Sequence, residues 1–500
     1  MEPSKRRPEF MPDTSTTLSQ LPWLGPAAGS DAFCLRDERR ALTYAQVEIE
    51  AGAFAEQLTY AGVSAGDVVA VMMPNSVELL IAMLGAWRVG AIVTPINPTF
   101  TPREVSYQIE DSHASILVGR RIREVDVATI ESDQMWRVST SPLAEARIDP
   151  NRVALLVYTS GSTGQPKGVM LDHANLNAMA TQIATHFRLT SDDHALLVLP
   201  LFHVNSLCVT FLAPMSVGAQ VTILERFAPQ SFISAAQAHR PTYFSAVPAI
   251  FAHLAALPTD VEFDTTSLRF AICGAAPVAP ELLERCQSRF GMKIIEGYGL
   301  TEATCASACN PIDGPRKPGS VGTALPGQQI RIVDSDGQEV APGERGEIVI
   351  SGPTVMRGYL GRIEATATAI RDGWLHTGDV GVQDDDGYVR VVDRIKDMII
   401  RGGENIYPKE IEAHLATHPG VLESAVVGRP DPVLGELPVA FVVVAPGFSA
   451  LTTDELIEHC REGLAKIKVP VAVDIVAELP RNPVGKVDKP ALRREFALIH

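Results

Sequence analysis

The chain is poor in positive charge, and this excludes one class of partner. Its 500 residues carry 43 lysines and arginines against 59 aspartates and glutamates, a formal net charge of −16. A protein that binds nucleic acid needs a basic face to neutralise phosphates. We therefore expect no nucleic-acid partner.

Paired cysteines are missing too. The seven cysteines include no C-x-x-C pair, and Cys305 and Cys309 have no nearby histidine to complete a zinc site. Unpaired thiols are typical of proteins from a reducing compartment. The sequence therefore predicts reduced, buried cysteines and a cytoplasmic location.

Long apolar runs are also absent. The most apolar window, residues 79–96, contains Arg88 and is interrupted by Gly85 and Gly90, whereas a membrane span needs about 20 predominantly apolar residues. The first ten residues are basic, but no apolar segment follows them as a secretory signal requires. We expect neither a transmembrane segment nor a secretory signal.

Local signals place the first elements of the chain. Residues 1–28 are polar and rich in Pro, Ser and Thr, and we expect them to be disordered. Residues 32–42 are suited to a hairpin around Asp37-Glu38. Thr43 then resembles the N-cap of a helix over 44–60. The chain therefore begins its ordered part near residue 29.

The order of apolar and polar segments predicts an α/β fold. Strand–helix–strand alternation covers residues 67–95 and recurs over 153–224 and 241–296, which is typical of doubly wound, mostly parallel sheets. After Gly319, turn-rich sequence separates short strands, which indicates a small antiparallel, β-barrel-like part. Both parts belong to a large N-terminal domain.

A small α+β domain follows. We place the boundary at residues 394–396, which gives a large domain over 29–394 and a C-terminal domain over 395–500. Five hundred residues exceed what one hydrophobic core usually holds, so two or more domains are expected.

The stretch VALLVYTSGSTGQPKGV, residues 153–169, carries the strongest chemical signal. An apolar run typical of a buried strand is followed by a loop of glycines and hydroxylated residues, whose backbone N–H groups can point at one anion. The loop is neither a Walker A motif nor the dinucleotide pattern G-x-G-x-x-G. A flexible surface turn is the competing interpretation. The loop predicts a polyphosphate cradle made by Thr159, Ser160, Gly161, Ser162, Thr163, Gly164 and Lys167.

Two further stretches supply groups suited to a nucleotide and a metal. PLFHVNS places His203 after the end of an apolar strand, where a lone histidine is usually just packed. EGYGLTE offers the ring of Tyr298 to stack on a base, the Thr301 hydroxyl to bind a phosphate, and the Glu302 carboxylate to hold Mg²⁺. The alternative for EGYGLTE is a glycine-rich turn with a structural tyrosine.

Two more stretches lie closer to the C-terminus. GWLHTGD puts Asp379 after a tight turn, where an acid could accept both hydroxyls of a ribose. RNPVGKVDK places Lys486 on a Pro/Gly loop that exposes it. The alternative is an ordinary solvated surface lysine, which is more common than a functional one. Together with the polyphosphate cradle, these groups fit one ligand, ATP with Mg²⁺.

Six motifs in order resemble one superfamily. YTSGSTGQPKGV, PLFHVNS, GYGLTEAT, GWLHTGD, DRIKDMIIRGGENIYPKEIE and NPVGKVDK span most of the chain from about residue 42. They resemble the adenylate-forming superfamily of acyl- and aryl-CoA synthetases, firefly luciferases and peptide-synthetase adenylation domains. The resemblance implies ATP, Mg²⁺ and CoA, and two half-reactions. A carboxylic acid is activated as acyl-AMP with release of pyrophosphate, and a thiol then takes the acyl group.

The resemblance also implies roles for individual residues. Thr301 contacts the α-phosphate, Glu302 holds Mg²⁺, and Lys486 bridges the substrate carboxylate and the α-phosphate. His203 sits at the junction of the acyl and nucleotide pockets. Besides the phosphate loop, the nucleotide is bound by Gly274, Ala275, Ala276, Glu296, Gly297, Tyr298, Gly299, Thr301, Asp379 and Arg394.

For the second half-reaction, the resemblance implies a small C-terminal domain that is mobile and swings about a hinge at Lys396. Arg401, Gly402 and Gly403 then line the tunnel for the pantetheine arm of CoA, and two glycines suit a thin chain that passes close to the backbone. A carrier-protein phosphopantetheine stays open as an alternative acceptor of the acyl group. A homodimer stays open as the oligomeric state.

The acyl pocket is inferred from the same resemblance. No acid accompanies His203 to pair an amino group, which argues against an α-amino acid. The lining residues are small and favour a long or bulky apolar acid. They are Asn205, Val209, Ser245, Ala246, Val247 and Cys273.

Overall fold

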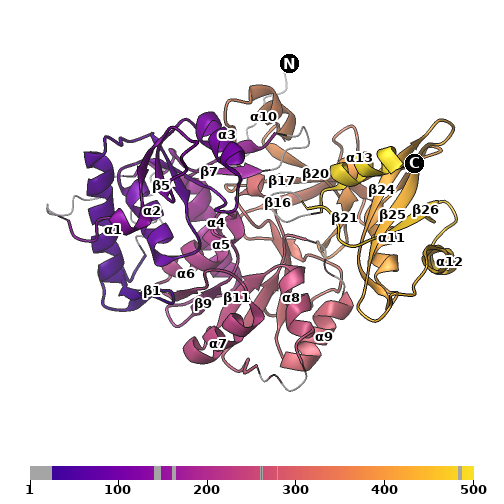
Figure 1. The fold of residues 1–500 in the computed structure, drawn as a ribbon, viewed down its shortest axis with the longest axis horizontal. Coiled ribbons are helices and arrows are strands. Elements are labelled where there is room, and N and C mark those ends of the chain that lie inside the picture. The colour runs from indigo at the N-terminus through magenta and orange to yellow at the C-terminus, as the bar shows by residue number, and fades with distance from the viewer. Residues whose placement is uncertain are drawn as a thin grey trace, which may run out of the picture. The chain divides into compact units, whose positions relative to one another are not determined.

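A computed structural model describes residues 25–139, 148–159, 165–258, 261, 263–276, 278, 280–481 and 487–499. It forms two compact units. The first comprises Met1–Val157 with Met170–Ser245, and the second comprises Tyr158–Val169 with Ala246–His500. Their elements follow the colour scale of Figure 1 from indigo to yellow.

The first unit contains the predicted parallel α/β layers. In one sheet, β3 pairs in parallel with β4 and β5, β4 with β7, and β5 with β6. In another, β9 pairs in parallel with β10 and β11, and β10 with β1. The strands are β1 (Phe33–Arg36), β2 (Ala41–Thr43), β3 (Val68–Met72), β4 (Ile92–Pro95), β5 (Ala114–Gly119), β6 (Ala128–Ile130), β7 (Val153–Thr159), β8 (Lys167–Asp172), β9 (His194–Leu197), β10 (Gln220–Ile223) and β11 (Tyr243–Ala246).

Helices connect these strands, as parallel pairing requires. They are α1 (Tyr44–Tyr60), α2 (Val77–Arg88), α3 (Pro102–Ser112), α4 (His173–His186), α5 (Val204–Leu207), α6 (Ala213–Ser216) and α7 (Pro229–His239), with a 3₁₀ turn at Ser132–Gln134 and a π-helical segment, η4, at Cys208–Leu212. The predicted cap is confirmed, because the Thr43 hydroxyl accepts the Gln46 N–H and the Gln46 side chain accepts the Thr43 N–H.

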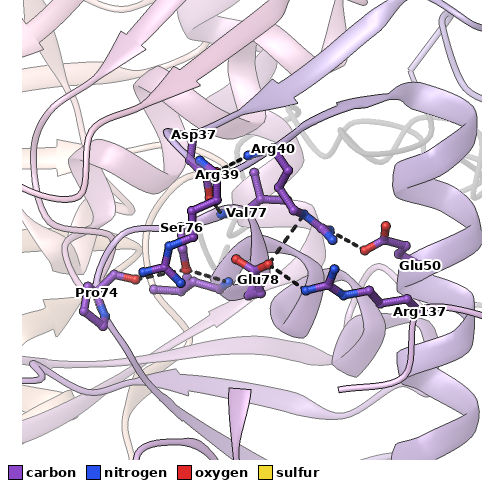
Figure 2. Close-up of polar contacts among 10 residues, drawn as sticks. Asp37, Arg39, Arg40, Glu50, Pro74, Ser76, Val77, Glu78 and Arg137 are labelled. Atoms are coloured by element: carbon purple, nitrogen blue, oxygen red, sulfur yellow. Dashed lines mark hydrogen bonds and ion pairs between the residues drawn. The ribbon is translucent and has the colours of Figure 1, made fainter. Parts of the chain in front are cut away.

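The hairpin of β1 and β2 fixes the start of α2. One carboxylate oxygen of Asp37 accepts the N–H groups of Arg39 and Arg40, and the other accepts the Val77 N–H at 2.9 Å. Figure 2 shows Asp37 and Val77 near Arg40, whose guanidinium pairs with Glu50. The turn therefore joins α2 to the hairpin.

A charged cluster continues from that turn. The Arg40 guanidinium also lies 3.5 Å from Glu78, and Arg137 lies 3.4 Å from the same Glu78 oxygen (Figure 2). Because Arg40 and Glu78 are mostly buried, each charge needs the other to offset its desolvation.

The second unit begins with the end of the α/β part. Strand β12 pairs with β13 in parallel, whereas β13–β14 and β14–β15 are antiparallel. These elements are α8 (Pro248–Ala255), β12 (Phe270–Cys273), α9 (Pro280–Phe290), β13 (Ile294–Tyr298), a 3₁₀ turn at Thr301–Ala303, β14 (Ala308–Cys309) and β15 (Thr323–Ala324).

The predicted antiparallel part follows. Strand β20 pairs antiparallel with β17, β19 and β21, and β17 pairs with β16. Its longest strand, β20, is not predicted from the sequence. The elements are β16 (Gln329–Val333), β17 (Arg345–Ser351), β18 (Gly358–Tyr359), α10 (Ile363–Ala369), β19 (Ile370–Arg371), β20 (Trp374–Gln383) and β21 (Val389–Arg394).

The remaining elements form an α+β sheet with order β23-β22-β25-β24, in which β26 also pairs with β25. In one buried cluster, Val426 of this sheet packs with Ile411 of α11 and Leu456 of α12. The elements are a 3₁₀ turn at Ile395–Asp397, β22 (Ile399–Arg401), β23 (Glu404–Ile406), α11 (Pro408–Leu415), β24 (Val421–Asp431), β25 (Gly435–Val444), α12 (Thr453–Gly463), β26 (Ala472–Val476) and α13 (Lys489–Ile499).

Two compositional predictions can be checked against these units. All seven cysteines are buried and unpaired, as expected. Among the residues that the structure describes, no helix combines the length and apolar character that a membrane span needs.

Candidate functional site

An aromatic ring, a carboxylate and a guanidinium meet in the second unit. The Tyr298 hydroxyl at the end of β13 donates a hydrogen bond of 2.6 Å to Asp379 Oδ2. Arg394 Nε lies 3.3 Å from Asp379 Oδ1, and the two residues are partners across β20 and β21. The structure thus brings together three of the residues predicted to bind the base and the ribose.

Asp379 is not placed as its motif suggests. It lies inside β20, and the prediction that it follows a tight turn is wrong. The register of β17 and β20 shifts here, and the Thr377 hydroxyl donates to the Ile348 carbonyl while the Gly378 N–H donates to Glu347. Gly378 has φ +71°, which glycine adopts without strain. The Thr-Gly pair therefore marks a β-bulge, a device that redirects a side chain.

The pKa of the Tyr298 phenol is raised well above its usual value, first by burial and then by the Asp379 carboxylate. The hydroxyl therefore stays protonated and remains a donor to Asp379. This bond fixes the ring, and a fixed ring presents a defined face for stacking.

The predicted backbone platform follows β12. The Gly274 N–H donates to the Ala246 carbonyl at 3.2 Å, and a Cβ on Gly274 would lie 3.2 Å from the Gly297 carbonyl oxygen. Ala275 has φ +66° and is exposed, as is Ala276. A non-glycine residue in this region costs of order 1–3 kcal/mol, and such strain is common at ligand sites.

A second group of contacts involves the end of the phosphate loop. The Tyr359 hydroxyl donates to Glu302 Oε1 at 2.9 Å, and the Lys167 ammonium lies 5.1 Å from the centroid of the Tyr359 ring. Burial, and then the Glu302 carboxylate, raise the pKa of Tyr359. The structure thus links two residues predicted to act on ATP through a third that the sequence analysis does not identify.

The carboxylate of Glu302 suits Mg²⁺ held jointly with a substrate. Within the described ranges, no three His, Cys, Asp or Glu side chains converge as a metal site. Mg²⁺ usually keeps several waters and binds through one or two carboxylates together with substrate phosphates. One carboxylate beside a phosphate loop matches that mode.

Glu296, also predicted for the nucleotide site, lines a pocket of about 200 Å³. The pocket is bordered by α9 residues such as Glu284 and Gln287, and by Arg316 and Lys317. Burial raises the pKa of Glu296 to about 7, although a hydrogen bond from the Gly319 backbone acts in the opposite direction. The carboxyl group therefore titrates near neutral pH.

Glycines hold the GYGLTEAT segment close to its neighbours. A Cβ on Gly299 would lie 1.8 Å from the Cys305 carbonyl oxygen, and one on Gly297 would lie 3.2 Å from the Cys309 sulfur. Thr301 opens the 3₁₀ turn that ends at Ala303. The segment is therefore tightly folded, and substituting Gly299 would disrupt it.

Part of the predicted site lies outside the described residues. This applies to Ser160, Gly161, Ser162, Thr163, Gly164 and Lys486. Thr159 ends β7, and Lys167 begins β8, a strand that the sequence analysis does not assign. The phosphate loop thus connects two strands.

Four predicted residues lie in the first unit. His203 precedes α5, and its ring lies 4.6 Å from that of Phe202. Val209 is buried in η4, and its carbonyl accepts the Tyr243 hydroxyl at 2.9 Å. Asn205 Oδ1 and Ser245 Oγ are buried atoms without a hydrogen-bond partner among the described residues.

The other three acyl-pocket residues, Ala246, Val247 and Cys273, belong to the second unit. Cys273 is buried at the end of β12, and its pKa is raised first by burial and then by Glu296. Such a thiol is a packing group and not a nucleophile.

The predicted hinge and tunnel residues are also placed. Lys396 lies in the 3₁₀ turn, and its pKa is lowered by burial of the ammonium and then by Arg394, although the residue as a whole is exposed. Gly402 and Gly403, with φ +60° and +86°, form the two-residue turn between β22 and β23. Both positive φ values fit a type I′ hairpin. Arg401 donates to the Ile467 carbonyl at 2.6 Å.

Comparisons with known proteins identify the family of the chain. The family model for AMP-binding enzymes matches residues 26–360, and the model for their C-terminal domain matches residues 410–486. Feruloyl-CoA synthase from Amycolatopsis sp. is 40% identical over 93% of this chain and 96% of its own. Sulfoacetate–CoA ligase from Cupriavidus necator is 36% identical over 91% and 92%, and long-chain-fatty-acid–CoA ligase from Bacillus subtilis is 33% identical over 98% and 96%.

Solved structures of CoA synthetases are similar to this chain over most of its length. ATP-bound MatB from Rhodopseudomonas palustris has a TM-score of 0.87 and 32% identity, over 93% of this chain and 96% of its own. O-succinylbenzoate coenzyme A synthetase from Bacillus subtilis, in complex with ATP and magnesium ion, has a TM-score of 0.85 and 32% identity over 93% and 96%. The chain belongs to the AMP-binding enzyme family of ATP-dependent acid–CoA ligases.

Proposed function

We propose that this enzyme activates a bulky, mostly apolar carboxylic acid as acyl-AMP and then transfers the acyl group to the thiol of CoA. The observation that carries the first step is the Tyr298–Asp379–Arg394 arrangement. A fixed ring can stack on adenine, and a carboxylate beside it can accept the hydroxyls of the attached ribose.

In the first half-reaction, the carboxylate attacks the α-phosphorus of ATP and pyrophosphate leaves. Negative charge on the phosphate oxygens then has to be neutralised. Lys167 and Lys486 supply positive charge, and the Thr301 hydroxyl supplies a donor. Glu302 would hold Mg²⁺, which neutralises phosphate charge when it is bound.

In the second half-reaction, the CoA thiol attacks the acyl-adenylate carbonyl and AMP leaves. The charge of Lys486 is no longer needed once pyrophosphate has gone. A rotation about Lys396 replaces this lysine by the Gly402–Gly403 turn, which has no side chains to obstruct a pantetheine arm.

The acid is proposed to carry one hydrogen-bond donor far from its carboxyl group. Asn205 and Val209 are four residues apart on one helical segment, and Tyr243 of β11 reaches the Val209 carbonyl. Ser245 is two residues after Tyr243, so its side chain lies on the same face of β11. The unpartnered Asn205 Oδ1 and Ser245 Oγ atoms therefore lie on two elements that contact each other through Tyr243 and Val209.

Buried polar atoms normally have partners, and leaving one unsatisfied costs about 1–3 kcal/mol. A hydroxyl on the acid would satisfy both atoms, because it can donate to Asn205 Oδ1 and accept from the Ser245 hydroxyl. Ferulate has such a phenolic hydroxyl at the end of an apolar body, and a feruloyl-CoA synthase is 40% identical to this chain. Octadecanoate has the apolar body alone, and sulfoacetate has neither.

Pyrophosphate release measured over a panel of acids, with and without CoA, tests the proposal. We expect ferulate to exceed 3,4-dimethoxycinnamate by about tenfold in kcat/KM, because the methyl ether lacks the donor. Acetate and sulfoacetate should be poor substrates. A preference for acetate, or no difference between phenol and ether, would contradict the assignment of the acid.

Two variants localise the effect. Asn205→Leu together with Ser245→Ala should remove the preference for the phenol. Thr210→Val is the matched control, because the Thr210 hydroxyl already donates to the Ser206 carbonyl at 3.0 Å within the same segment. The preference should survive in this control.

A further inference from the structure

Tyr359 lies between two groups expected to act on ATP. Its hydroxyl donates to Glu302 Oε1 at 2.9 Å, and its ring centroid is 5.1 Å from Lys167 Nζ. One side chain therefore contacts both the predicted metal ligand and the lysine that ends the phosphate loop.

The backbone around Tyr359 is held on two sides. The Tyr359 N–H donates to Thr366 Oγ1 at 2.9 Å, and the Leu360 N–H donates to the Gly168 carbonyl at 2.8 Å. Gly358, with φ +137°, turns the chain into this position. Because Gly168 directly follows Lys167, the Leu360 hydrogen bond also fixes the strand that carries the lysine.

These contacts restrict the groups that would face the phosphates. A hydrogen bond to one carboxylate oxygen fixes the rotation of Glu302 and directs the other oxygen away from Tyr359. The ring attracts the Lys167 ammonium through its negative face. Because that attraction uses no hydrogen bond, the ammonium keeps its donors for a phosphate.

We propose that Tyr359 is a positioning residue that presets the Glu302 carboxylate for Mg²⁺ and the Lys167 ammonium for the phosphates of ATP. The inference rests on the proposed function, since it assigns both partners to the ATP site. The hydroxyl serves the metal side and the ring serves the lysine side, so two substitutions separate them.

Calorimetric titration with ATP, in the presence of Mg²⁺ and in its absence with EDTA, measures both effects without turnover. Tyr359→Phe removes the hydroxyl and keeps the ring. Its Kd for ATP should rise about tenfold with Mg²⁺, the lower end of the range for a hydrogen bond to a charged group, and should not change with EDTA. Tyr359→Leu also removes the ring, and its Kd with EDTA should rise about three- to fivefold.

Tyr388→Phe is the matched control. The Tyr388 hydroxyl also donates a hydrogen bond, to the Pro315 carbonyl at 2.6 Å, and its ring also lies under a lysine, with Lys317 Nζ at 4.4 Å. This residue is outside the proposed ATP contacts, so neither Kd should change. If Tyr388→Phe raised the Kd for ATP as much as Tyr359→Phe does, the proposal would be overturned. Such a result would mean that any tyrosine of this unit has the same effect.

A double-mutant cycle checks the link to the metal ligand. If the hydroxyl acts through Glu302, Tyr359→Phe has no further effect on Mg²⁺ dependence in a Glu302→Gln background. Full additivity would refute the link. Equal weakening of ATP with and without Mg²⁺ in Tyr359→Phe would also refute it, since that result indicates a structural defect.

The same titrations distinguish a failure of the proposed function from a failure of the role proposed for Tyr359. If the unsubstituted enzyme bound no ATP, the proposed function would fail. If it bound Mg²⁺-ATP and the Tyr359→Phe variant bound it equally well, only the role of Tyr359 would fail.

Discussion

The Glu296 carboxyl group should make the second unit less stable as the pH rises. Burial raises its pKa from 4.5 to about 7. Between these two values the native state holds a proton that the unfolded chain has already lost. The stabilisation is therefore fully present below about pH 4.5 and is lost as the pH rises through 7.

The size of the effect follows from the shift. A change from 4.5 to about 7 corresponds to about 3 kcal/mol at 1.36 kcal/mol per unit. This is an upper value, because Glu296 is only partly buried and water screens its charge. Between about pH 5 and pH 8 the unit should lose roughly 2 kcal/mol from this group. For a unit of this size, that amounts to a fall in Tm of about 4–8 °C.

Glu296→Gln is the informative substitution, since glutamine has the same shape and does not titrate. Differential scanning calorimetry without ATP should show that the difference in Tm between variant and wild type moves in favour of the variant from pH 5 to pH 8. Glu284→Gln is the control, because Glu284 borders the same pocket but is exposed. A difference that is independent of pH, or equal in both variants, would show that burial of Glu296 does not set its pKa.

Three further predictions concern the reaction. Lys486→Ala should abolish acyl-AMP formation but leave thioester formation from supplied acyl-AMP nearly intact, as single-turnover assays of each half-reaction can show; equal losses would contradict this division. Lys396→Pro fixes φ at the proposed hinge, so adenylation should continue while thioester formation stops; a normal overall rate would mean that no rotation occurs there. Asn205→Phe should fill space in the acyl site and shift kcat/KM toward small acids such as acetate, because each buried methylene contributes about 0.8 kcal/mol only where it fits. An unchanged order of kcat/KM among the acids would show that Asn205 does not line the acyl site.

Much of the fold can be predicted because its local signals agree with each other. Thr43 and Gln46 form a capping box that sets the start of α1 within the sequence itself. The β1–β2 hairpin has its turn where the sequence places it, because Asp37 accepts two backbone N–H groups of the turn. Such signals involve residues at most a few positions apart.

The secondary-structure predictions are wrong where contacts between residues distant in the sequence determine the structure. The Thr377–Gly378 pair suggests a turn, yet β17 lies opposite and accommodates the pair as a bulge within β20. Lys167 follows a glycine-rich loop and Pro166, and only pairing across the sheet makes it the start of β8.

The candidate site shows the same limit. The motifs predict that Tyr298, Asp379 and Glu302 bind the nucleotide or the metal, and in the structure the first two are hydrogen-bonded to each other. Tyr359 has no motif signal beyond its place in MRGYL. Its relation to Glu302 spans 57 residues and depends on how β18 is placed. The roles of these residues remain predictions.

One buried carboxylate bears on how freely the C-terminal elements can rotate. Asp393, 1% exposed, accepts the N–H of Arg394 at 2.7 Å and, through its other oxygen, the N–H of Lys409 at the start of α11 at 2.8 Å. Lys396 lies between these two donors, so any rotation there that carries α11 away from β21 breaks the second bond. A hydrogen bond to a charged group contributes about 1.5–3 kcal/mol. If the proposed rotation about Lys396 breaks this bond, we expect Asp393 to bias the enzyme toward the unrotated arrangement by roughly 10- to 100-fold, and other contacts would have to offset that bias.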